Sequence, residues 1–338
     1  DCADFGRALC AACFELGAKD VVMDWRDDVC SREHWLHADD SVFDAVYPWD
    51  VEKNTQLGRE GAGFISVSAS DPENLRGVST DRLRRWEEAS GRDQKEFYRT
   101  MMANGFPWCV VSVPVLSWAK KVFPNDGDAA AMEKLWNAIF KTVRVTEGGD
   151  AVEAWRAHCA YLDEMAGKLN ALQLKQVRYK NALGTDVVVG LPEEHVWLAG
   201  ADTARSGVRF VANMPTEEVF SAPKRDAVDG VLAASKPLAL NGNVIEGIRL
   251  TLEHGRIVGI HADTNEDVLR QAIARIIWAK SRLFRSIRRL RRADFSSIIR
   301  CLMRTPRATL PLGRPIRRAC RTGTTFLRKN WCGAASTP

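Results

Sequence analysis

The chain has 338 residues, of which 46% are apolar and 27% charged, so its composition is that of a globular protein with one large or two medium domains. Disordered and collagen-like chains are excluded. The formal net charge of +5 is very unevenly distributed: positions 275–338 hold 15 Arg and two Lys against one acid, Asp294, and carry +16. The remaining positions, 1–274, carry −11. The overall charge therefore averages two unrelated segments and does not indicate a class of partner.

Nothing in the sequence indicates a membrane segment or a disulfide framework. The longest apolar stretch, Trp108–Ala119, is too short to span a bilayer, and no signal peptide is evident, so we expect a cytoplasmic protein without membrane contact. The nine Cys have no regular spacing, and we interpret the Cys10-x-x-Cys13 pair as two small residues on a buried helix face rather than a zinc or redox site. The chain begins at Asp1 inside a predicted helix, so we expect a fragment at its amino end.

Helical and strand-like segments alternate in the first half of the chain, which predicts an α/β layered domain with a mostly parallel sheet over residues 1–178. The expected elements, in chain order, are a helix at Phe5–Leu16, strands at Lys19–Trp25 and Gly63–Ala69, a helix from Asp71 to Thr100, a strand from Val110, and helices at Ala129–Arg144 and Val152–Leu174.

The pattern changes near Tyr179 to short strand-like runs separated by Gly, Pro and Asn. The expected strands are Thr185–Leu191, Gly207–Ala212, Gly230–Leu232, Asn243–Leu252 and Arg256–His261, followed by a helix at Asp263–Ala274. This predicts an incomplete, β-rich α+β second domain over residues 179–274, with a boundary between residues 175 and 182. Residues 275–338 are expected to form an irregular, Arg-rich basic tail.

The run N-M-P-T-E-E-V-F at Asn213–Phe220 resembles the thermophilic-type metallo-aminopeptidase family, the group of aminopeptidases T, S and II. Further matching segments occur in the order found in that family: Gly17-Ala18-Lys19, Trp118-Ala119 through Val122-Phe123-Pro124, Leu135-Trp136, Leu183-Gly184-Thr185-Asp186, Gly190-Leu191 through His195 and Trp197, and Lys236-Pro237-Leu238. The resemblance covers almost all of residues 1–274.

This resemblance implies a metal-dependent exopeptidase that removes amino-terminal residues from peptides. It implies two divalent ions (zinc, cobalt or magnesium) held in the second domain, and a homodimer among intact relatives. Two such ions can lower the pKa of a bridging water and polarise the scissile carbonyl. The family's first carboxylate ligand falls in the Glu217-Glu218 pair, and the sequence leaves open which of the two faces the metal, because neighbours on an extended segment face opposite ways.

Three other positions have structural interpretations beside functional ones. His195 and Trp197 are candidates for residues near the substrate, although a hydrogen-bonded His beside a packed Trp is the more common arrangement. We interpret His158 as structural.

The tail lacks the family's remaining metal ligands, since residues 278–338 contain no His, Glu or Tyr. When its codons are regrouped by one frame, the genetic code permits strings such as Y-N-T-L-F-D-E-N-A and S-C-H-I-A-F-G-K-A-Y-P, which are similar to the missing family segment. The hypothesis is a frameshift near residues 274–277, natural or from sequencing. A chain so altered is expected to hold no metal stably and to be inactive or nearly so.

Two alternative functions follow from the sequence. Fifteen Arg in the tail could neutralise nucleic-acid phosphates, but the tail has no interleaved aromatic pattern and no known motif, so we expect no specific nucleic-acid binding. The other alternative is a scaffold without chemistry. In that case the second domain would leave apolar surface uncovered.

Overall fold

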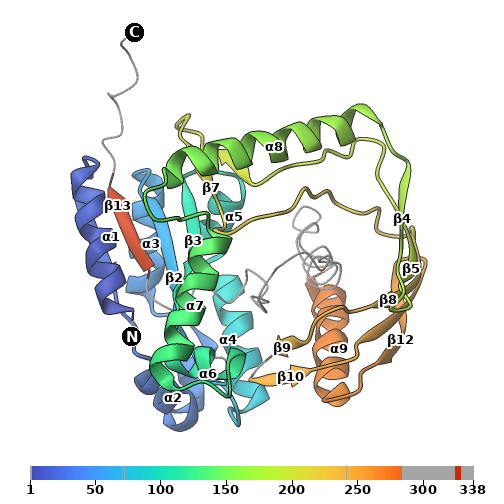
Figure 1. The fold of residues 1–338 in the computed structure, drawn as a ribbon. Coiled ribbons are helices and arrows are strands. Elements are labelled where there is room, and N and C mark those ends of the chain that lie inside the picture. Colours follow the sequence, from blue (N-terminus) through green and yellow to red (C-terminus); the bar gives the residue numbers. More distant parts are fainter. Residues whose placement is uncertain (1, 72, 241, 284–323, 329–338) are drawn as a thin grey trace. The chain divides into compact units, whose positions relative to one another are not determined.

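The computed structural model describes residues 2–71, 73–240, 242–283 and 324–328, which are drawn as coloured ribbon in Figure 1. They form two compact units. Residues up to Cys159, residues 200–217 and the strand at 324–328 belong to the first unit, and residues 160–199 and 218–283 belong to the second. The ranges 1–178 and 179–274 for the two domains stay predictions.

The first unit is organised around a four-stranded sheet with the order β1-β13-β2-β3. Its strands are β1 (Asp20–Asp24), β2 (Gly63–Ser68), β3 (Trp108–Ser112) and β13 (Thr324–Arg328). β2 and β3 pair in parallel, whereas β13 lies antiparallel to both β1 and β2. The prediction of a mostly parallel sheet is therefore wrong for two of the three pairings, because β13 separates strands that run in the same direction.

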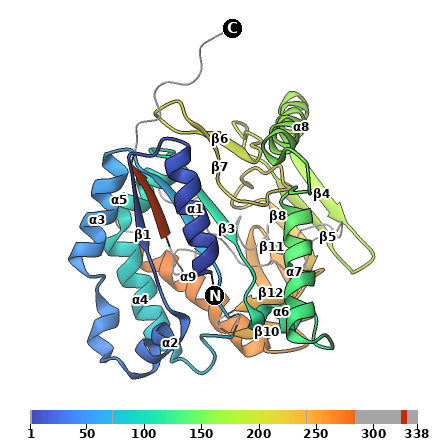
Figure 2. The same ribbon diagram turned by 60° about the vertical axis from the view of Figure 1, so that its left-hand side comes forward.

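Helices cover both faces of this sheet. Successive side chains along a strand point to opposite sides, so each face presents its own side chains to a helix layer. On one face, Leu57 of α3 (Pro48–Arg59) and Phe97 of α5 (Lys95–Met102) form an apolar cluster with Phe64 of β2 and Phe106. On the other face lies α1 (Ala3–Glu15), seen in front of the sheet in Figure 2. Gly6 of α1 lies against the Trp25 indole, so a larger side chain at this position would require the ring to shift.

The long helix predicted over Asp71–Thr100 is wrong. A turn occupies residues 73–77, and two helices follow, α4 (Thr80–Asp93) and α5, separated at Gln94. The predicted helix at Ala129–Arg144 is present as α7 (Asp128–Thr142). Three helices and a 3-10 turn had no predicted counterpart: α2 (Asp28–His37), η1 (Asp40–Asp44), α3 and α6 (Leu116–Val122).

The second unit contains a five-stranded antiparallel sheet with the order β12-β11-β8-β5-β4, and the predicted β-rich character is confirmed. The run predicted as one strand at Asn243–Leu252 is two strands, because Gly247 adopts φ +63 and turns the chain where a side chain would meet Asp263. The strands are β4 (Gln176–Lys180), β5 (Asp186–Gly190), β8 (Val228–Ala233), β11 (Arg249–Glu253) and β12 (Arg256–His261), with a separate pair of β9 (Leu238–Leu240) and β10 (Asn243–Ile245).

The core of this unit lies between its sheet and α9 (Glu266–Leu283). Val187, Leu232, Leu250 and Ile273 are among its fully or almost fully buried members. Two small strands of the first unit, β6 (Ala201–Thr203) and β7 (Arg209–Val211), form a hairpin. The helix α8 (Ala151–Ala171) contributes its residues up to Cys159 to the first unit and the rest to the second.

The basic tail is regular where the structure describes it. Residues 275–283 continue α9, and residues 324–328 form β13, so the prediction of an irregular tail is wrong for these parts. The remaining tail residues lie outside the described chain. Within the described part, no helix is both long and apolar enough to cross a bilayer.

Candidate functional site

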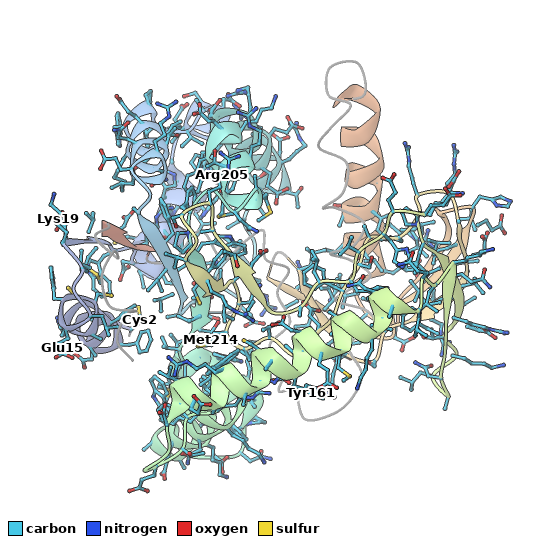
Figure 3. The ribbon with its side chains drawn as sticks, turned by 90° about the horizontal axis from the view of Figure 1, so that it is seen from above. Cys2, Glu15, Lys19, Tyr161, Arg205 and Met214 are labelled. Atoms are coloured by element: carbon cyan, nitrogen blue, oxygen red, sulfur yellow. The ribbon has the colours of Figure 1, made fainter. Side chains whose placement is uncertain are left out.

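The N-M-P-T-E-E-V-F segment continues the sheet of the first unit along β3. The backbone N–H of Val110 donates to the Ala212 carbonyl at 2.9 Å, and the Met214 N–H donates to the Val110 carbonyl at 2.9 Å. A parallel bridge links Val110 with Asn213. Upstream of the motif, the Arg205 N–H donates to the Asn104 carbonyl, so the stretch from Arg205 to Met214, both labelled in Figure 3, is tied to this unit by main-chain hydrogen bonds. The start of the motif is therefore fixed to β3 by main-chain hydrogen bonds.

Arg144, just after the end of α7, binds that first glutamate with both arms of its guanidinium. Its Nη1 lies 2.7 Å from Oε1 of Glu217, and its Nη2 lies 3.0 Å from Oε2. Arg144 adopts φ +59 and lies over the Trp155 ring, 5.4 Å from its centroid. The Trp155 indole N–H donates to the Val143 carbonyl at 2.7 Å and so fixes the ring. A bidentate pair on an aromatic support is a strong arrangement for a carboxylate.

His158 of α8 fixes the residue before the pair. Its Nε2 lies 2.8 Å from the Thr216 carbonyl, and because a carbonyl can only accept, Nε2 carries the proton. The same nitrogen lies 3.7 Å from Oε2 of Glu217, and only 9% of the His158 side chain is exposed. The structural interpretation of His158 fits these contacts, since its ring holds the motif's backbone.

Glu218 differs from Glu217 in the unit to which it belongs, in its burial and in its side-chain contacts. It begins a segment of the second unit, is half-buried, and its side chain forms no hydrogen bond or ion pair within the described residues. Two residues later, Phe220 and Leu198 exchange backbone hydrogen bonds of 2.9 Å. The motif thus presents one neutralised carboxylate and one carboxylate available to a ligand.

His195 and Trp197 come together in the second unit, with ring centroids 6.4 Å apart. His195 donates from Nδ1 to the Pro192 carbonyl at 2.8 Å, which leaves its Nε2 as an acceptor. The buried Nε2 and the buried Trp197 Nε1 both lack a hydrogen-bond partner within the described residues. Asn170 holds the Trp197 backbone through two hydrogen bonds of 2.8 and 2.9 Å. No hydrogen bond or ion pair joins either ring to Glu218 in the described chain.

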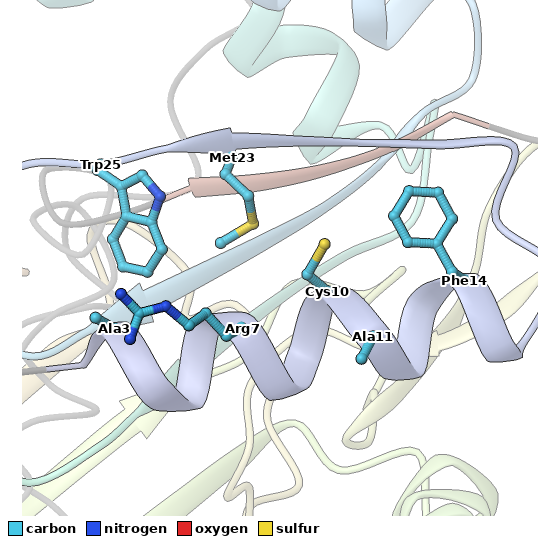
Figure 4. A pocket seen from close by; sticks show the side chains of 7 residues that line it. All are labelled: Ala3, Arg7, Cys10, Ala11, Phe14, Met23 and Trp25. Carbon is cyan, nitrogen blue, oxygen red and sulfur yellow. The ribbon is translucent and has the colours of Figure 1, made fainter.

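Cys10 and Cys13 lie on α1, where Cys10 lines the shallow hollow between this helix and β1 shown in Figure 4. Cys13 is buried, and burial together with the neighbouring Cys10 raises the pKa of its thiol. Burial raises the pKa of Cys109 on β3 to about 12. A raised pKa disfavours the thiolate that metal binding or nucleophilic attack requires, which favours a packing role for these residues.

The described residues do not by themselves fit a two-metal centre. No group of three or more His, Cys, Asp or Glu in the described chain is arranged to hold a metal ion. Of the candidate pair, Glu217 is already bound to Arg144, so the motif offers the single carboxylate of Glu218. A structural zinc site takes four protein ligands and a catalytic one takes three, so one carboxylate is not enough.

Sequence reasoning missed Arg144 and Asn170, which position the candidate residues. Arg144 lies 73 residues from its partner Glu217, and Asn170 lies 27 residues from Trp197. Neither belongs to a motif, and only the packing of α7 and α8 brings them to their partners.

Comparisons with known proteins identify the same family that the motif indicated. The model of the family described as thermophilic metalloprotease (M29) matches residues 1–275. Aminopeptidase AmpS of Bacillus subtilis is 37% identical over 273 residues, which cover 81% of this chain and 66% of that protein. Aminopeptidase PepS of Streptococcus thermophilus is 39% identical over 272 residues, 80% of this chain and 65% of that protein.

A solved structure, that of AmpT from Thermus thermophilus, matches with a TM-score of 0.66 and 35% identity over 73% of this chain and 60% of that one. The chain therefore spans slightly less than two thirds of the length of these relatives.

Proposed function

Because the chain belongs to the M29 family of thermophilic metalloproteases, we propose that it derives from an aminopeptidase that hydrolyses amino-terminal residues from peptides. The observation that carries the proposal is the motif at residues 213–220, which lies inside the family match and is held in a defined conformation by β3, Arg144 and His158. Peptides are the substrates we propose, a homodimer is the assembly we expect of intact relatives, and the cytoplasm is the compartment we propose.

Within the motif, Glu218 is the carboxylate we assign to metal, and Glu217 is the one we assign to structure. If Glu217 bound a metal ion, the Arg144 guanidinium would lose its partner. If Glu218 bound the metal ion, no interaction within the described residues would be lost. The metal, when bound, would activate a water and polarise the scissile carbonyl. His195 and Trp197 stay candidates for residues near the substrate, since each retains an unpartnered buried nitrogen within the described residues.

The test of this assignment uses a version of the gene with the frame restored. Glu218→Gln should remove at least one equivalent of zinc or cobalt, measured by equilibrium dialysis and elemental analysis. Glu217→Gln should retain metal and lower the thermal stability instead. Equal loss of metal in both variants, or loss only in Glu217→Gln, would contradict the assignment.

The tail is the second part of the proposal. The family match ends at residue 275, at the position where the charge changes sign and where the frame is proposed to shift. Sequencing the gene across codons 260–290 tests this directly. If restoring one or two bases there opens no reading frame that encodes H-I-A-F-G-K-A-Y-P, the frameshift hypothesis is wrong.

As its sequence stands, we propose that the chain binds metal weakly and has little or no peptidase activity. The described residues supply too few ligands, and the tail from residue 278 adds no His or Glu. An assay on amino-terminal peptide substrates with added zinc, cobalt or magnesium checks this. Release of amino acids at the rate of an intact relative would overturn it.

A further inference from the structure

The turn that ends α7 contains an arginine at a position that suits glycine. Val145 donates its backbone N–H to the Phe140 carbonyl at 2.9 Å, and Arg144, which lies in this turn, adopts φ +59. Such a turn puts the residue after the helix in the left-handed region, where glycine meets no steric cost and a residue with a side chain does. The contacts of the Arg144 side chain therefore offset the cost of its backbone conformation.

Those contacts fix the guanidinium of Arg144 in one place. Its Nη1 lies 2.7 Å from Oε1 of Glu217 and 3.2 Å from the Thr142 carbonyl, while its Nη2 lies 3.0 Å from Oε2 of Glu217. The guanidinium also lies over the ring of the buried Trp155. Because arginine presents a planar fork of donors, it orients a carboxylate as well as neutralising it. Glu217 is therefore fixed although its side chain is 45% exposed.

A second contact fixes the backbone next to this ion pair. His158 donates from Nε2 to the carbonyl of Thr216 at 2.8 Å, and Thr216 is buried, so the peptide that leads into the glutamate pair is held in place. Within the described residues, Glu218 is a partner of neither Arg144 nor His158. Backbone and side-chain contacts thus hold Glu217 and leave the next carboxylate unbound by them.

We propose that Arg144 is a positioning residue that selects between the two adjacent glutamates: it withdraws Glu217 from cation binding and leaves Glu218 as the carboxylate that a divalent cation can reach. Arginine does not lose its proton in proteins, so this withdrawal persists wherever Glu217 is ionised. Specificity between two similar groups is often obtained by disabling one of them. The identity of the cation as a catalytic metal rests on the proposed function, whereas the selection between the carboxylates does not.

Carbodiimide-coupled amidation of the full chain as its sequence stands tests the selection without any metal. Peptide mass spectrometry with fragmentation between the two glutamates measures their separate rates. Glu217 should react more slowly than Glu218, and in Arg144→Gly the rate of Glu217 should rise at least about threefold, because the ion pair is lost while glycine keeps the turn. Glu96, which pairs with Arg59 in the same unit, should keep its rate and so show that the unit stays folded.

Two further variants and a rescue control complete the test. Arg144→Met removes the ion pair without introducing a glycine and should raise the rate of Glu217 to a similar extent. Arg156→Met is the matched control, because Arg156 pairs with Glu153 on α8 and its loss should leave Glu217 unchanged. Guanidinium ions far below the unfolding concentration should slow the reaction of Glu217 again in Arg144→Gly, and sodium chloride of equal ionic strength should not. An unchanged rate of Glu217 in both Arg144 variants, or equal rescue by the two salts, would overturn the proposal.

A metal-binding experiment on the frame-restored protein separates this proposal from the proposed function. Glu218→Gln should lose a metal equivalent in equilibrium dialysis, whereas Arg144→Gly combined with Glu218→Gln should retain more of it, because the released Glu217 can supply the missing carboxylate. If Glu218→Gln keeps its metal while Glu217 stays protected from amidation, the metal assignment is wrong and the selection stands. If the double variant binds no more metal than Glu218→Gln, the selection is contradicted even where the assignment holds.

Discussion

The two sheets of this protein are completed in different ways. In the second unit, β4 pairs with β5 and β11 with β12, each with its successor in the chain, and all five strands lie between residues 176 and 261, inside the family match. In the first unit, the sheet includes a strand from position 324, outside that match. The contrast teaches that all strands of one sheet come from the part of the sequence inside the family match, whereas the other sheet includes a strand from a distant segment outside it.

The largest effects are expected from matched core truncations in the two units. Phe106 is 1% exposed and its ring contacts Phe64 and Phe97, while Leu232 is 1% exposed in the core of the second unit. Phe106→Ala should cost about 4 kcal/mol and Leu232→Ala about 3 kcal/mol of unfolding free energy in the unit that carries the change. Chemical denaturation followed by hydrogen exchange assigns each loss to its unit. An equal loss in both units from either variant would show that they unfold as one and would break the comparison.

A smaller effect is expected at the backbone of Trp197. Asn170→Ala removes the donor to the Trp197 carbonyl and the acceptor for its N–H, so the second unit should lose about 2 kcal/mol. Gln173→Ala is the control, because this exposed side chain donates one hydrogen bond to the Asn170 carbonyl and should cost less than about 1 kcal/mol. Denaturation midpoints of the two variants decide between these outcomes.

A third change tests the ion pair at the motif. Arg144→Met keeps apolar contact with Trp155 but removes the bidentate bond to Glu217, and we expect a loss of about 1 kcal/mol confined to the first unit. Arg156→Met serves as control, since its 3.5 Å contact with Glu153 is exposed and is expected to contribute almost nothing. If the two variants lose equal stability, Arg144 does not hold the motif as described.

The smallest effect is the response to acid, and it should be shared by both units. The hydrogen bond from Arg92 lowers the pKa of Asp93 in the first unit, and the one from Arg178 lowers the pKa of Asp186 in the second. A carboxyl with a lowered folded-state pKa contributes stability above its unfolded pKa and loses it as the pH falls through the folded value. Thermal melts from pH 6 downward should show stability falling below about pH 4, where unfolded Asp residues take up protons. Asp93→Asn and Asp186→Asn should each flatten this dependence.

The sequence predicted the buried strands best, because apolar β-branched runs such as Val21-Val22 and Val110-Val111 have few alternatives. It missed α2 and α3, whose polar and charged residues give little helical periodicity. In the site, the motif was recognised from its sequence alone, yet the distinction between Glu217 and Glu218 came from Arg144. That contact depends on how α7 ends and cannot be inferred from spacing.

The path of the chain limits how this protein can be divided. The sequence passes from the first unit to the second after Cys159, returns at Gly200 and leaves again after Glu217. A fragment that ends at residue 159 would lack the segment that pairs with β3, and a fragment that starts at residue 160 would carry that segment without its support. Limited proteolysis or expression of either half is therefore a poor source of an isolated domain. A design that needs the first unit alone must graft both residues 200–217 and the β13 strand back by linkers.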